Sequence, residues 1–518
     1  MATTNYSNDD RHKDVAVLHS MGYAQELERR MSAFSNYAVS FSIICILSDG
    51  INSLGQATAG AGGASLGIGW PVGCVISGVF ALGMAQIASA YPTAGGLYHW
   101  SSILGGRFAG WLTAWLNLLG LITVLGAINA GTWGFFGSSI GAWFGVATDA
   151  STTEGFRNQI VFVAAITFVQ AIINHFGIRL TARLTDFSGY LIFAVTIVLT
   201  LACFAFAEHW DWSRIWTFHN YTGDPTLNAA NELKGDPVWP SKVSMTMAFL
   251  LSLLLPIYTI TGYDASVHTS EETQHATLAV PRAIVSSIMW GGAIGYLLLV
   301  AFLLMLPDLD QAASQGWNVF FWAMQQRVPA ATRNVLYALI FLAQALCGLA
   351  TVTSASRMIY AFARDGGLPA ASLLASVSPR LRTPAAAIWS AAIAALLFVW
   401  GAKWLENSGA PVYSVVVSCT VIFLYLSCVV PIALGLIAYG GPKWPRMGPW
   451  TMGRAAFSSA ALLSVASMLG IFILGVQPPN QLAFKVTIGF VLLSVLVWFG
   501  FERRRFRGPP RPDMQRNQ

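Results

Sequence analysis

The most restrictive feature of this chain is the number and length of its apolar stretches. An α-helix needs roughly 20 apolar residues to cross a bilayer, and twelve stretches meet that requirement. Composition agrees, since 55% of the 518 residues are hydrophobic and only 10% are charged. This balance excludes an ordinary soluble protein and predicts an all-α integral membrane protein. The predicted spans begin near Phe34, Gly67, Phe108, Ile160, Phe187, Val243, Ile284, Val335, Ala385, Tyr413, Ala455 and Ala483.

The placement of the basic residues predicts how the chain is threaded. With the amino terminus in the cytoplasm, 21 of the 29 Lys and Arg residues fall inside and eight outside. This asymmetry follows the positive-inside rule and predicts that both termini are cytoplasmic. The net charge of +6 is therefore read as a membrane signature, with no nucleic-acid partner. The polar first 33 residues lack the apolar core of a cleaved signal. We expect a multi-pass protein of the plasma membrane or the bacterial inner membrane.

Two of the predicted spans are interrupted at mid-length by a short polar segment that contains glycine. In the first span the segment runs from Leu47 to Ser53, and in the sixth span from Thr259 to Asp264. A helix break in the hydrocarbon leaves backbone groups unpaired, which is tolerated only where they line a cavity or hold a ligand. Paired breaks in corresponding spans of two halves point to the binding site of a secondary transporter.

The two breaks also indicate an internal repeat. The first and sixth spans, and their central glycines Gly50 and Gly262, are separated by nearly the same number of residues. Because five spans are an odd number, the second set of five enters the membrane from the opposite side, which makes the halves an inverted repeat. The predicted domains are a cytoplasmic tail (1–33), a first five-helix repeat (34–207), an extracellular linker loop (208–242), a second, inverted five-helix repeat (243–439), helices 11 and 12 (440–502) and a basic cytoplasmic tail (503–518).

Three further segments carry recognisable motifs. Residues 91–100 read YPTAGGLYHW, residues 262–273 read GYDASVHTSEET and residues 356–369 read SRMIYAFARDGGLP. In this order they resemble motifs of the amino acid–polyamine–organocation superfamily, in the amino acid/choline branch that includes γ-aminobutyrate and choline permeases. The resemblance covers roughly residues 34–501. It implies the leucine-transporter-type fold, with 12 transmembrane helices, of which ten form a 5+5 inverted repeat and two lie outside it.

The breaks supply the candidate substrate-binding residues. Amide groups freed at the end of a half-helix, helped by the positive end of its dipole, suit a substrate carboxylate. A glycine there lets backbone and ligand approach closely, although small residues also serve helix packing. An aromatic ring beside the site is expected to cover the substrate and to bind a quaternary ammonium. The candidates are Ser48, Asp49, Gly50, Ile51, Asn52 and Ser53 at the first break and Thr261, Gly262, Tyr263 and Asp264 at the second.

Asp49 and Asp264 are the strongest of these candidates. A carboxylate at the centre of a span costs about 2.5–3.5 kcal/mol on insertion scales and is functional by default. Asp49 is expected to hold the ammonium group of the substrate or to carry a coupled proton, and Asp264 to line the site or to cap the second half-helix. The family branch more often has a small or polar residue at the position of Asp49. A cationic or polyamine-like substrate is therefore an alternative.

Charged residues beyond the second break predict an inner gate. His268, Glu271 and Glu272 lie near the cytoplasmic end of the sixth span. The two acids are expected to pair with Arg357 or Arg364 and to separate when the cytoplasmic path opens. A solvated helix end is the plainer interpretation of the same residues.

The coupling ion is left open by the sequence. Thr351, Thr353 and Ser354 resemble a hydroxyl-bearing stretch that holds sodium in some relatives. Proton-coupled relatives have a lysine in the fifth span, and the sequence has none between Phe187 and Ala207. We therefore predict coupling to a proton or to sodium, with no metal site assigned with certainty.

Other classes of function fit less well. The eight histidines are dispersed and the six cysteines lie in apolar runs without metal-ligand spacing, so neither an enzyme nor a cofactor is expected. Channels usually repeat a filter in symmetric copies. We predict a secondary active transporter for an amino acid or related small amine such as γ-aminobutyrate, working by alternating access. A choline or polyamine transporter and a non-transporting nutrient sensor are the alternatives. Residues 220–222 also match a glycosylation acceptor at Asn220.

Overall fold

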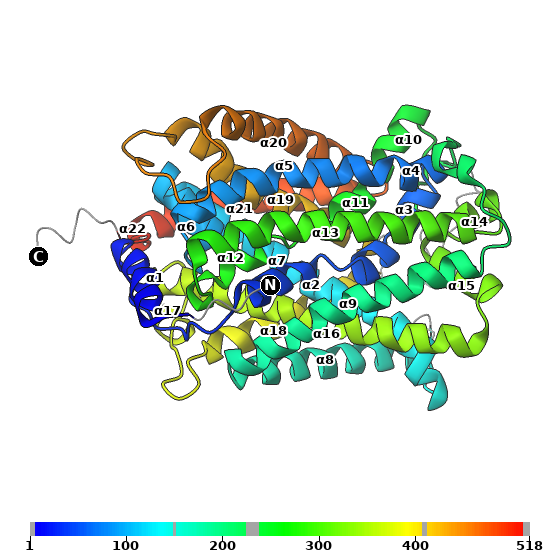
Figure 1. The fold of residues 1–518 in the computed structure, drawn as a ribbon, viewed down its shortest axis with the longest axis horizontal. Helices are drawn as coiled ribbons and strands as arrows, with labels where there is room; N and C mark the ends of the chain where they lie inside the picture. The colour runs from blue at the N-terminus through cyan, green and yellow to red at the C-terminus, as the bar shows by residue number, and fades with distance from the viewer. Residues whose placement is uncertain (1–5, 149–151, 224–237, 407–411, 511–518) are drawn as a thin grey trace, which may run out of the picture.

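Long helices that run along the longest axis of the molecule make up most of the protein (Figure 1). The computed structural model describes residues 6–148, 152–223, 238–406 and 412–510. Ten helices in these ranges are long and apolar enough to cross a membrane. They contain α5 (Gly69–Ala90), α7 (Arg107–Phe136), α8 (Thr153–His175), α9 (Ile178–Ala205), α13 (Ala276–Met305), α16 (Ala330–Arg364), α18 (Ala385–Glu406), α19 (Val412–Ala438), α20 (Arg454–Gly475) and α21 (Gln481–Val497).

The first and sixth spans are interrupted helices. The first consists of α2 (Ala33–Ile43), a π-helical turn η1 (Ile46–Gly50) and α3 (Leu54–Thr58). The sixth consists of α10 (Met245–Ser252), α11 (Leu254–Thr259) and α12 (Ala265–His268). Together with the ten uninterrupted helices they account for the twelve predicted spans. The predicted all-α membrane fold is confirmed.

Helices that occupy equivalent places in the two halves contact each other. The second span α5 packs on the seventh, α13; the third span α7 packs on the eighth, α16; and the fourth span α8 packs on the ninth, α18. A pseudo-two-fold axis between two five-helix repeats brings such pairs together. Helices α20 and α21 follow the repeats and pack against α19.

Some helices extend well beyond the apolar stretches that predict them. Helix α8 begins at Thr153 where its apolar stretch begins near Ile160, and α13 begins at Ala276 where its apolar stretch begins near Ile284. The hydroxyl of Thr152 caps α8 by accepting the N–H of Gly155. Hydropathy marks only the part of a helix that suits lipid, whereas backbone hydrogen bonding continues into its polar first turns.

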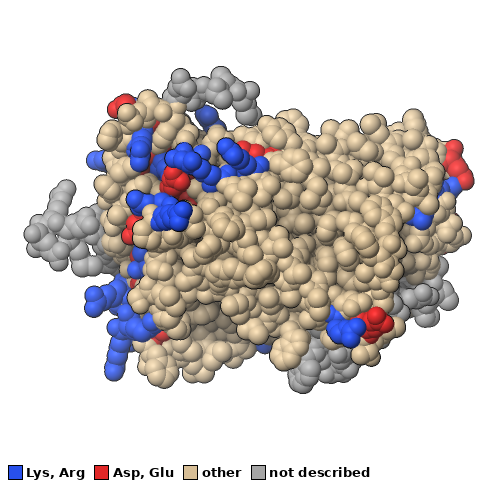
Figure 2. Space-filling view, turned by 90° about the horizontal axis from the view of Figure 1, so that it is seen from below, with Lys and Arg blue, Asp and Glu red and all other residues tan. Residues whose placement is uncertain are grey.

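The outer helices present apolar side chains to their surroundings. Val161, Leu201, Leu397, Leu463 and Leu496 are each more than half exposed. Between the ends of the molecule, the surface in Figure 2 is almost free of charged side chains. A surface of this kind is stable in contact with lipid and not with water.

Basic side chains gather at one end of the molecule, on the left of Figure 2. This basic end holds α1 (Asn8–Ser20), α6 (Gly96–Gly105), α17 (Ala371–Leu374) and α22 (Arg503–Arg505), as Figure 1 shows. The opposite end holds α14 (Leu309–Ser314) and α15 (Val319–Arg327). The charge asymmetry predicted along the sequence therefore becomes an asymmetry between two ends in space.

The described parts of the loop between the halves pack onto the end opposite the basic end. The hydroxyl of Tyr221 donates to Asp310 at 2.7 Å, and the indole of Trp239 donates to the carbonyl of Gln56 at 3.0 Å. The side-chain amide of Asn220 donates to the carbonyl of Val243 at 2.7 Å. Residues 224–237 of this loop and residues 511–518 of the basic tail lie outside the described residues.

Candidate functional site

The two interrupted spans contact each other where their helices break. The hydroxyl of Ser40 on α2 donates to the carbonyl of Tyr263 and accepts the N–H of Ser266, both at 2.9 Å. Gly262 has φ +85°, and a Cβ there would overlap the side chain of Ile43. Only glycine combines this backbone conformation with such a close approach. The two breaks thus form one central region of the fold.

The first interruption lies earlier in the chain than the sequence predicts. Ile44 and Cys45 are the non-helical residues, before the predicted segment that begins at Leu47. The π-helical turn Ile46–Gly50 follows them directly. No glycine or proline marks this point. Ile44 instead packs closely over Gly291 of α13, where a Cβ would lie 3.0 Å from its Cγ2 atom.

The structure also shows how the backbone amides of the first break are used. The N–H groups of Ser48 and Asp49 both donate to the carbonyl of Cys45, at 2.9 and 3.0 Å. The amide of Ser48, predicted to meet a substrate carboxylate, is therefore bonded within its own turn. The first amides of a helical segment lack an acceptor inside it. The positions that offer N–H groups are therefore Ile46 and Leu47.

Nearly all predicted substrate-binding residues lie in the protein interior. Asp49 is 2% exposed, and the hydroxyl of Ser48 lies 3.3 Å from its Oδ1 atom. Tyr258 of α11 is another polar neighbour of this carboxyl. Ser48, Asp49, Gly50, Ile51, Ser53, Thr261, Gly262, Tyr263 and Asp264 are buried, and Asn52 is half-buried.

Asp264 is held by a side chain from the third span. The amide of Asn117 on α7 donates to Oδ2 of Asp264 at 2.9 Å and to the hydroxyl of Ser427 on α19 at 3.3 Å. Asp264 occupies the position before α12, but its side chain makes no capping hydrogen bond to that helix. The alternative interpretation of Asp264 as a helix cap is therefore wrong.

Two amide side chains that the sequence did not single out reach the breaks. Asn117 reaches the second break, and the amide of Gln344 on α16 donates to the carbonyl of Leu47 in the first break at 2.7 Å. They lie on the third and eighth spans, which are equivalent in the two halves. Each is a single amide in an apolar span, and that weak signal does not distinguish a site residue from a helix contact.

His268 lies with Asp264 and not with the arginines. Its Nε2 atom is 3.5 Å from Oδ2 of Asp264, and its Nδ1 atom is 3.1 Å from the carbonyl oxygen of Ala94. The N–H of the same Ala94 donates to Glu271 at 3.0 Å. The structure therefore separates His268 from the group of charges with which it was predicted to act.

Two buried ion pairs join the segment beyond the second break to the end of α16. Nε and Nη2 of Arg357 each lie 3.0 Å from the carboxylate of Glu272, and all of these side-chain atoms are buried. Nη1 and Nη2 of Arg364 each lie 3.0 Å from the carboxylate of Glu271. Both pairs are bidentate, the strongest geometry for such contacts. The plainer interpretation, a solvated helix end, is wrong because Glu271 and Glu272 have no solvent exposure.

Comparison with known proteins agrees with this architecture. Residues 31–501 match the model of the amino acid permease family. The chain belongs to that family. This amino acid permease is 30% identical over 528 residues to the amino-acid permease BAT1 of Arabidopsis thaliana and 31% identical over 517 residues to its homolog in Oryza sativa. Each alignment covers 95% of both chains.

A yeast relative extends the comparison. An uncharacterized amino-acid permease of Schizosaccharomyces pombe is 27% identical over 523 residues, covering 97% of this chain and 87% of its own. Because the chain belongs to the amino acid permease family, it is a multi-pass membrane transporter and not an enzyme.

The amino-terminal segment of the permease covers the ion pairs. The side-chain amide of Gln25 donates to the carbonyl of Glu271 at 2.8 Å, and the N–H of Met31 donates to the carbonyl of Glu272 at 2.8 Å. The ring of Tyr23 lies 3.9 Å below the guanidinium carbon of Arg364. The sequence predicts only a cytoplasmic tail here, because nothing local in a polar segment reveals partners that lie far away along the chain.

Tyr23 also contacts Asp365, the residue after α16. Its hydroxyl donates to Oδ2 of Asp365 at 2.7 Å, and the hydroxyl of Tyr98 donates to the same oxygen. Burial raises the pKa of Asp365, while the neighbouring Arg364 opposes the shift. The carboxyl therefore ties the amino-terminal segment, the loop helix α6 and the end of α16 together.

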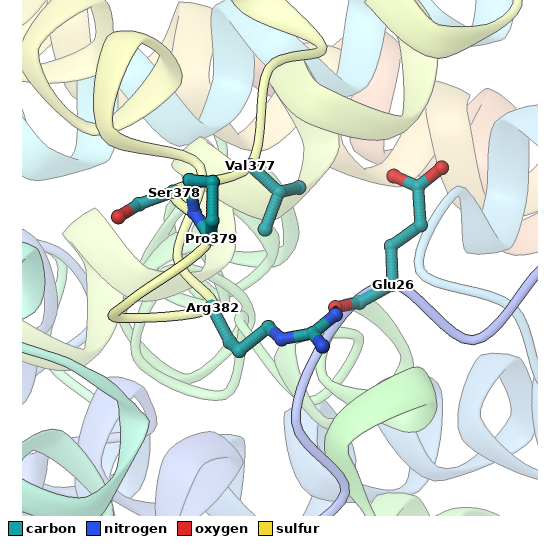
Figure 3. A pocket seen from close by; sticks show the side chains of 5 residues that line it. All are labelled: Glu26, Val377, Ser378, Pro379 and Arg382. Atoms are coloured by element: carbon teal, nitrogen blue, oxygen red, sulfur yellow. The ribbon is translucent and has the colours of Figure 1, made fainter.

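A surface pocket of about 390 Å³ opens at the basic end beside this cover. Glu26, Val377, Ser378, Pro379 and Arg382 line it, and Figure 3 shows Arg382 extending toward the backbone of Glu26. Nη1 of Arg382 lies 3.4 Å from that carbonyl oxygen. The pocket belongs to the contact between the amino-terminal segment and the loop before α18, and no residue of either break lines it.

The three hydroxyl residues of the predicted ion site lie on α16. Thr351 and Ser354 donate to carbonyls one turn earlier in their own helix, at 3.0 and 3.3 Å. Thr353 donates to the side chain of Asn174 on α8 at 2.8 Å. The Thr353 hydroxyl also lies 3.0 Å from the carbonyl oxygen of Leu349, so all three hydroxyls contact their own helix and Thr353 contacts α8 as well.

Proposed function

We propose that this permease is a secondary active transporter of a zwitterionic amino acid or a related small amine such as γ-aminobutyrate, working by alternating access. The observation that carries the proposal is the contact between two helix breaks, one containing the buried Asp264 and the other followed directly by the π-helical turn that holds the buried Asp49. Interrupted backbone and carboxyl groups at this depth are retained where a polar ligand is held. The helices around the breaks come from both halves, as a rocking mechanism requires.

In this proposal the substrate binds between free backbone N–H groups and the side chain of Asp49 at the first break. Its carboxylate meets the N–H groups at Ile46 and Leu47, at the positive end of the half-helix. Its ammonium group meets Asp49, a buried acid whose charge a cation neutralises. Tyr263 covers the substrate, and Gly262 keeps the two breaks in contact. Ser48, Gly50, Ile51, Asn52, Ser53 and Thr261 complete the site.

The arrangement corresponds to a closed state of the transporter. The ion pairs of Glu271 with Arg364 and of Glu272 with Arg357 form the inner gate, and the amino-terminal segment covers them. Transport requires these pairs to separate as the basic end opens to the cytoplasm. Uphill transport then draws on a proton or sodium gradient, for which the hydroxyls of Thr351, Thr353 and Ser354 are the sodium candidates.

A cation such as choline or putrescine is the second candidate substrate. It is favoured by the presence of two buried carboxyl groups, Asp49 and Asp264, in one central region. Two carboxylates hold a diamine or a quaternary ammonium better than they hold a zwitterion.

Uptake into proteoliposomes tests both candidates. A labelled panel of α-amino acids, γ-aminobutyrate, choline and putrescine is offered under an imposed proton or sodium gradient. Accumulation of a zwitterion supports the proposal, and accumulation of choline or putrescine alone favours the cation transporter. Binding of a panel member without uptake favours a sensor.

Replacing Asp49→Asn tests the ammonium site directly. We expect uptake of the accepted substrate to fall more than about tenfold, because a charge-assisted contact contributes at least about 1.4 kcal/mol. Asp9→Asn is the matched control, since the Asp9 side chain is 75% exposed and pairs with the exposed Lys13. Wild-type uptake by correctly inserted Asp49→Asn protein contradicts the assignment.

A further inference from the structure

We propose that Asp264 and His268 hold one shared proton and form the coupling-proton site of this permease. The inference rests on the proposed transport function, whose coupling ion it names. The two side chains are 3% and 0% exposed, respectively, and lie at the second break.

The hydrogen-bond donors and acceptors of Asp264 and His268 match only when the pair holds an additional proton. A backbone carbonyl only accepts, so Nδ1 of His268, 3.1 Å from the carbonyl oxygen of Ala94, carries a hydrogen. In a neutral imidazole the other nitrogen is then a bare acceptor. That nitrogen, Nε2, is buried without a hydrogen-bond partner and lies 3.5 Å from Oδ2 of Asp264.

Two bare acceptors facing each other in the protein interior are unfavourable. A proton between them removes the conflict in either of two ways. It makes His268 an imidazolium beside a carboxylate, or it makes Asp264 a carboxylic acid that donates to a neutral ring. In both cases the pair holds one proton more than a neutral histidine and an ionised aspartate do. Asn117 donates to the same carboxyl oxygen and holds it in place.

The other charges near the pair are already balanced. Helix α12 packs against α2, α13, α16 and the turn Ser270–Glu272. The titratable groups on or beside these elements include Glu271, Glu272, Arg357, Arg364, Tyr263 and Cys428, and Arg282 of α13 is exposed. Each of the two acids is matched by an arginine. The pair itself therefore determines whether a proton is bound.

A chain of direct contacts joins the pair to the inner gate. The carbonyl of Ala94 contacts His268, and the N–H of Ala94 donates to Glu271 at 3.0 Å. Glu271 in turn holds Arg364. Loss of the proton turns Nε2 into an acceptor facing a carboxylate, so His268 is expected to move. This movement would displace the Ala94 peptide and thereby Glu271, which belongs to the proposed inner gate.

Proton movement in proteoliposomes tests the proposal in the working protein. A trapped pH-sensitive dye reports protons, and labelled γ-aminobutyrate together with the α-amino acid panel reports substrate. We expect His268→Gln to exchange substrate across the membrane while its substrate-driven proton flux falls at least about tenfold. His209→Gln is the control, because His209 is exposed in the linker loop. A wild-type ratio of protons to substrate in His268→Gln overturns the proposal.

A second measurement needs no transport. A proton that the folded pair holds makes the folding equilibrium depend on pH. The thermal midpoint of the wild type in detergent, measured in a series of buffers, is therefore expected to change with pH. His268→Gln and Asp264→Asn are expected to show a smaller change, and His209→Gln the full change.

The two measurements separate the possible failures. Absence of any panel transport by the wild type, together with the expected pH dependence of the midpoint, overturns the proposed transport function but leaves the proton site. Identical pH dependence in wild type, His268→Gln and Asp264→Asn overturns the proton site even if transport is observed.

Discussion

The absence of a side chain at Gly262 allows the two breaks to contact each other at the centre of this permease. Its left-handed backbone and its contact with Ile43 bring the second break against the end of α2. A side chain at this position is disfavoured twice, by the backbone conformation and by overlap. At the residue scale, the site therefore depends on the absence of a Cβ at Gly262 as much as on the carboxyl groups around it.

Gly262→Ala is expected to lower both stability and transport. The left-handed conformation alone costs roughly 1–2 kcal/mol for a residue with a Cβ, and displacement of Ile43 adds to it. Thermal unfolding in detergent and substrate uptake measure the two effects. Gly78→Ala on α5 is the control, because a Cβ there meets no atom within 4 Å. Equal midpoints for the two variants would show that the breaks do not need this contact.

At the scale of elements, the charged pairs bind α16 to the segment beyond α12. Arg357 and Glu272 are both fully buried, so each neutralises a charge that water cannot reach. Removing one partner of such a pair is costly, whereas removing both is often nearly neutral. The pair therefore holds two elements in register more than it stabilises the fold as a whole.

Single and double substitutions distinguish these roles. Arg357→Met is expected to destabilise the protein by about 3–5 kcal/mol, because it leaves Glu272 charged and unpaired. Adding Glu272→Gln is expected to restore most of that loss. Thermal midpoints of the two single variants and the double variant measure the coupling. Additive losses in the double variant would contradict the pairing.

The amino-terminal segment is a second element whose role can be measured. Deleting residues 1–30 removes the contacts of Tyr23, Gln25 and Arg29 with the gate, including the bond from Arg29 to the carbonyl of Ser270 at 3.1 Å. We expect the basic end to open more often. A Ser270→Cys probe, placed at a buried position in a background without the native cysteines, should react faster with a maleimide after the deletion. Unchanged labelling would show that the ion pairs alone keep this end closed.

At the scale of the whole molecule, the separation of charge sets the orientation in the membrane. Basic side chains gather at the end that holds α1 and α22 (Figures 1 and 2). Positive-inside threading predicts that this end is cytoplasmic. Tags at the two termini should then be protected from protease in sealed, outside-out cells and become accessible together on permeabilisation. Accessibility of one terminus alone would indicate an odd number of spans.

The sequence by itself determined the spans, the second break and the relation between the halves. Hydropathy is a local property, and the polar, glycine-containing segment from Thr259 to Asp264 inside an apolar run marks the second break, whereas Asp49 and Gly50 lie in the π-helical turn that follows the first break. The sequence also predicted that Glu271 and Glu272 pair with arginines of the eighth span, because buried charges require partners. Which acid meets which arginine was not.

Only the tertiary structure decided the remaining features of the site. The first interruption lies at Ile44 and Cys45, where neither residue type favours a break and contact with α13 accompanies the bend. His268 faces Asp264 and the Ala94 peptide, although the sequence grouped it with Glu271 and Glu272. The amino-terminal segment covers the two ion pairs. Each of these features depends on contacts with residues more than 100 positions away, or on a backbone turn that the spacing along a regular helix does not describe.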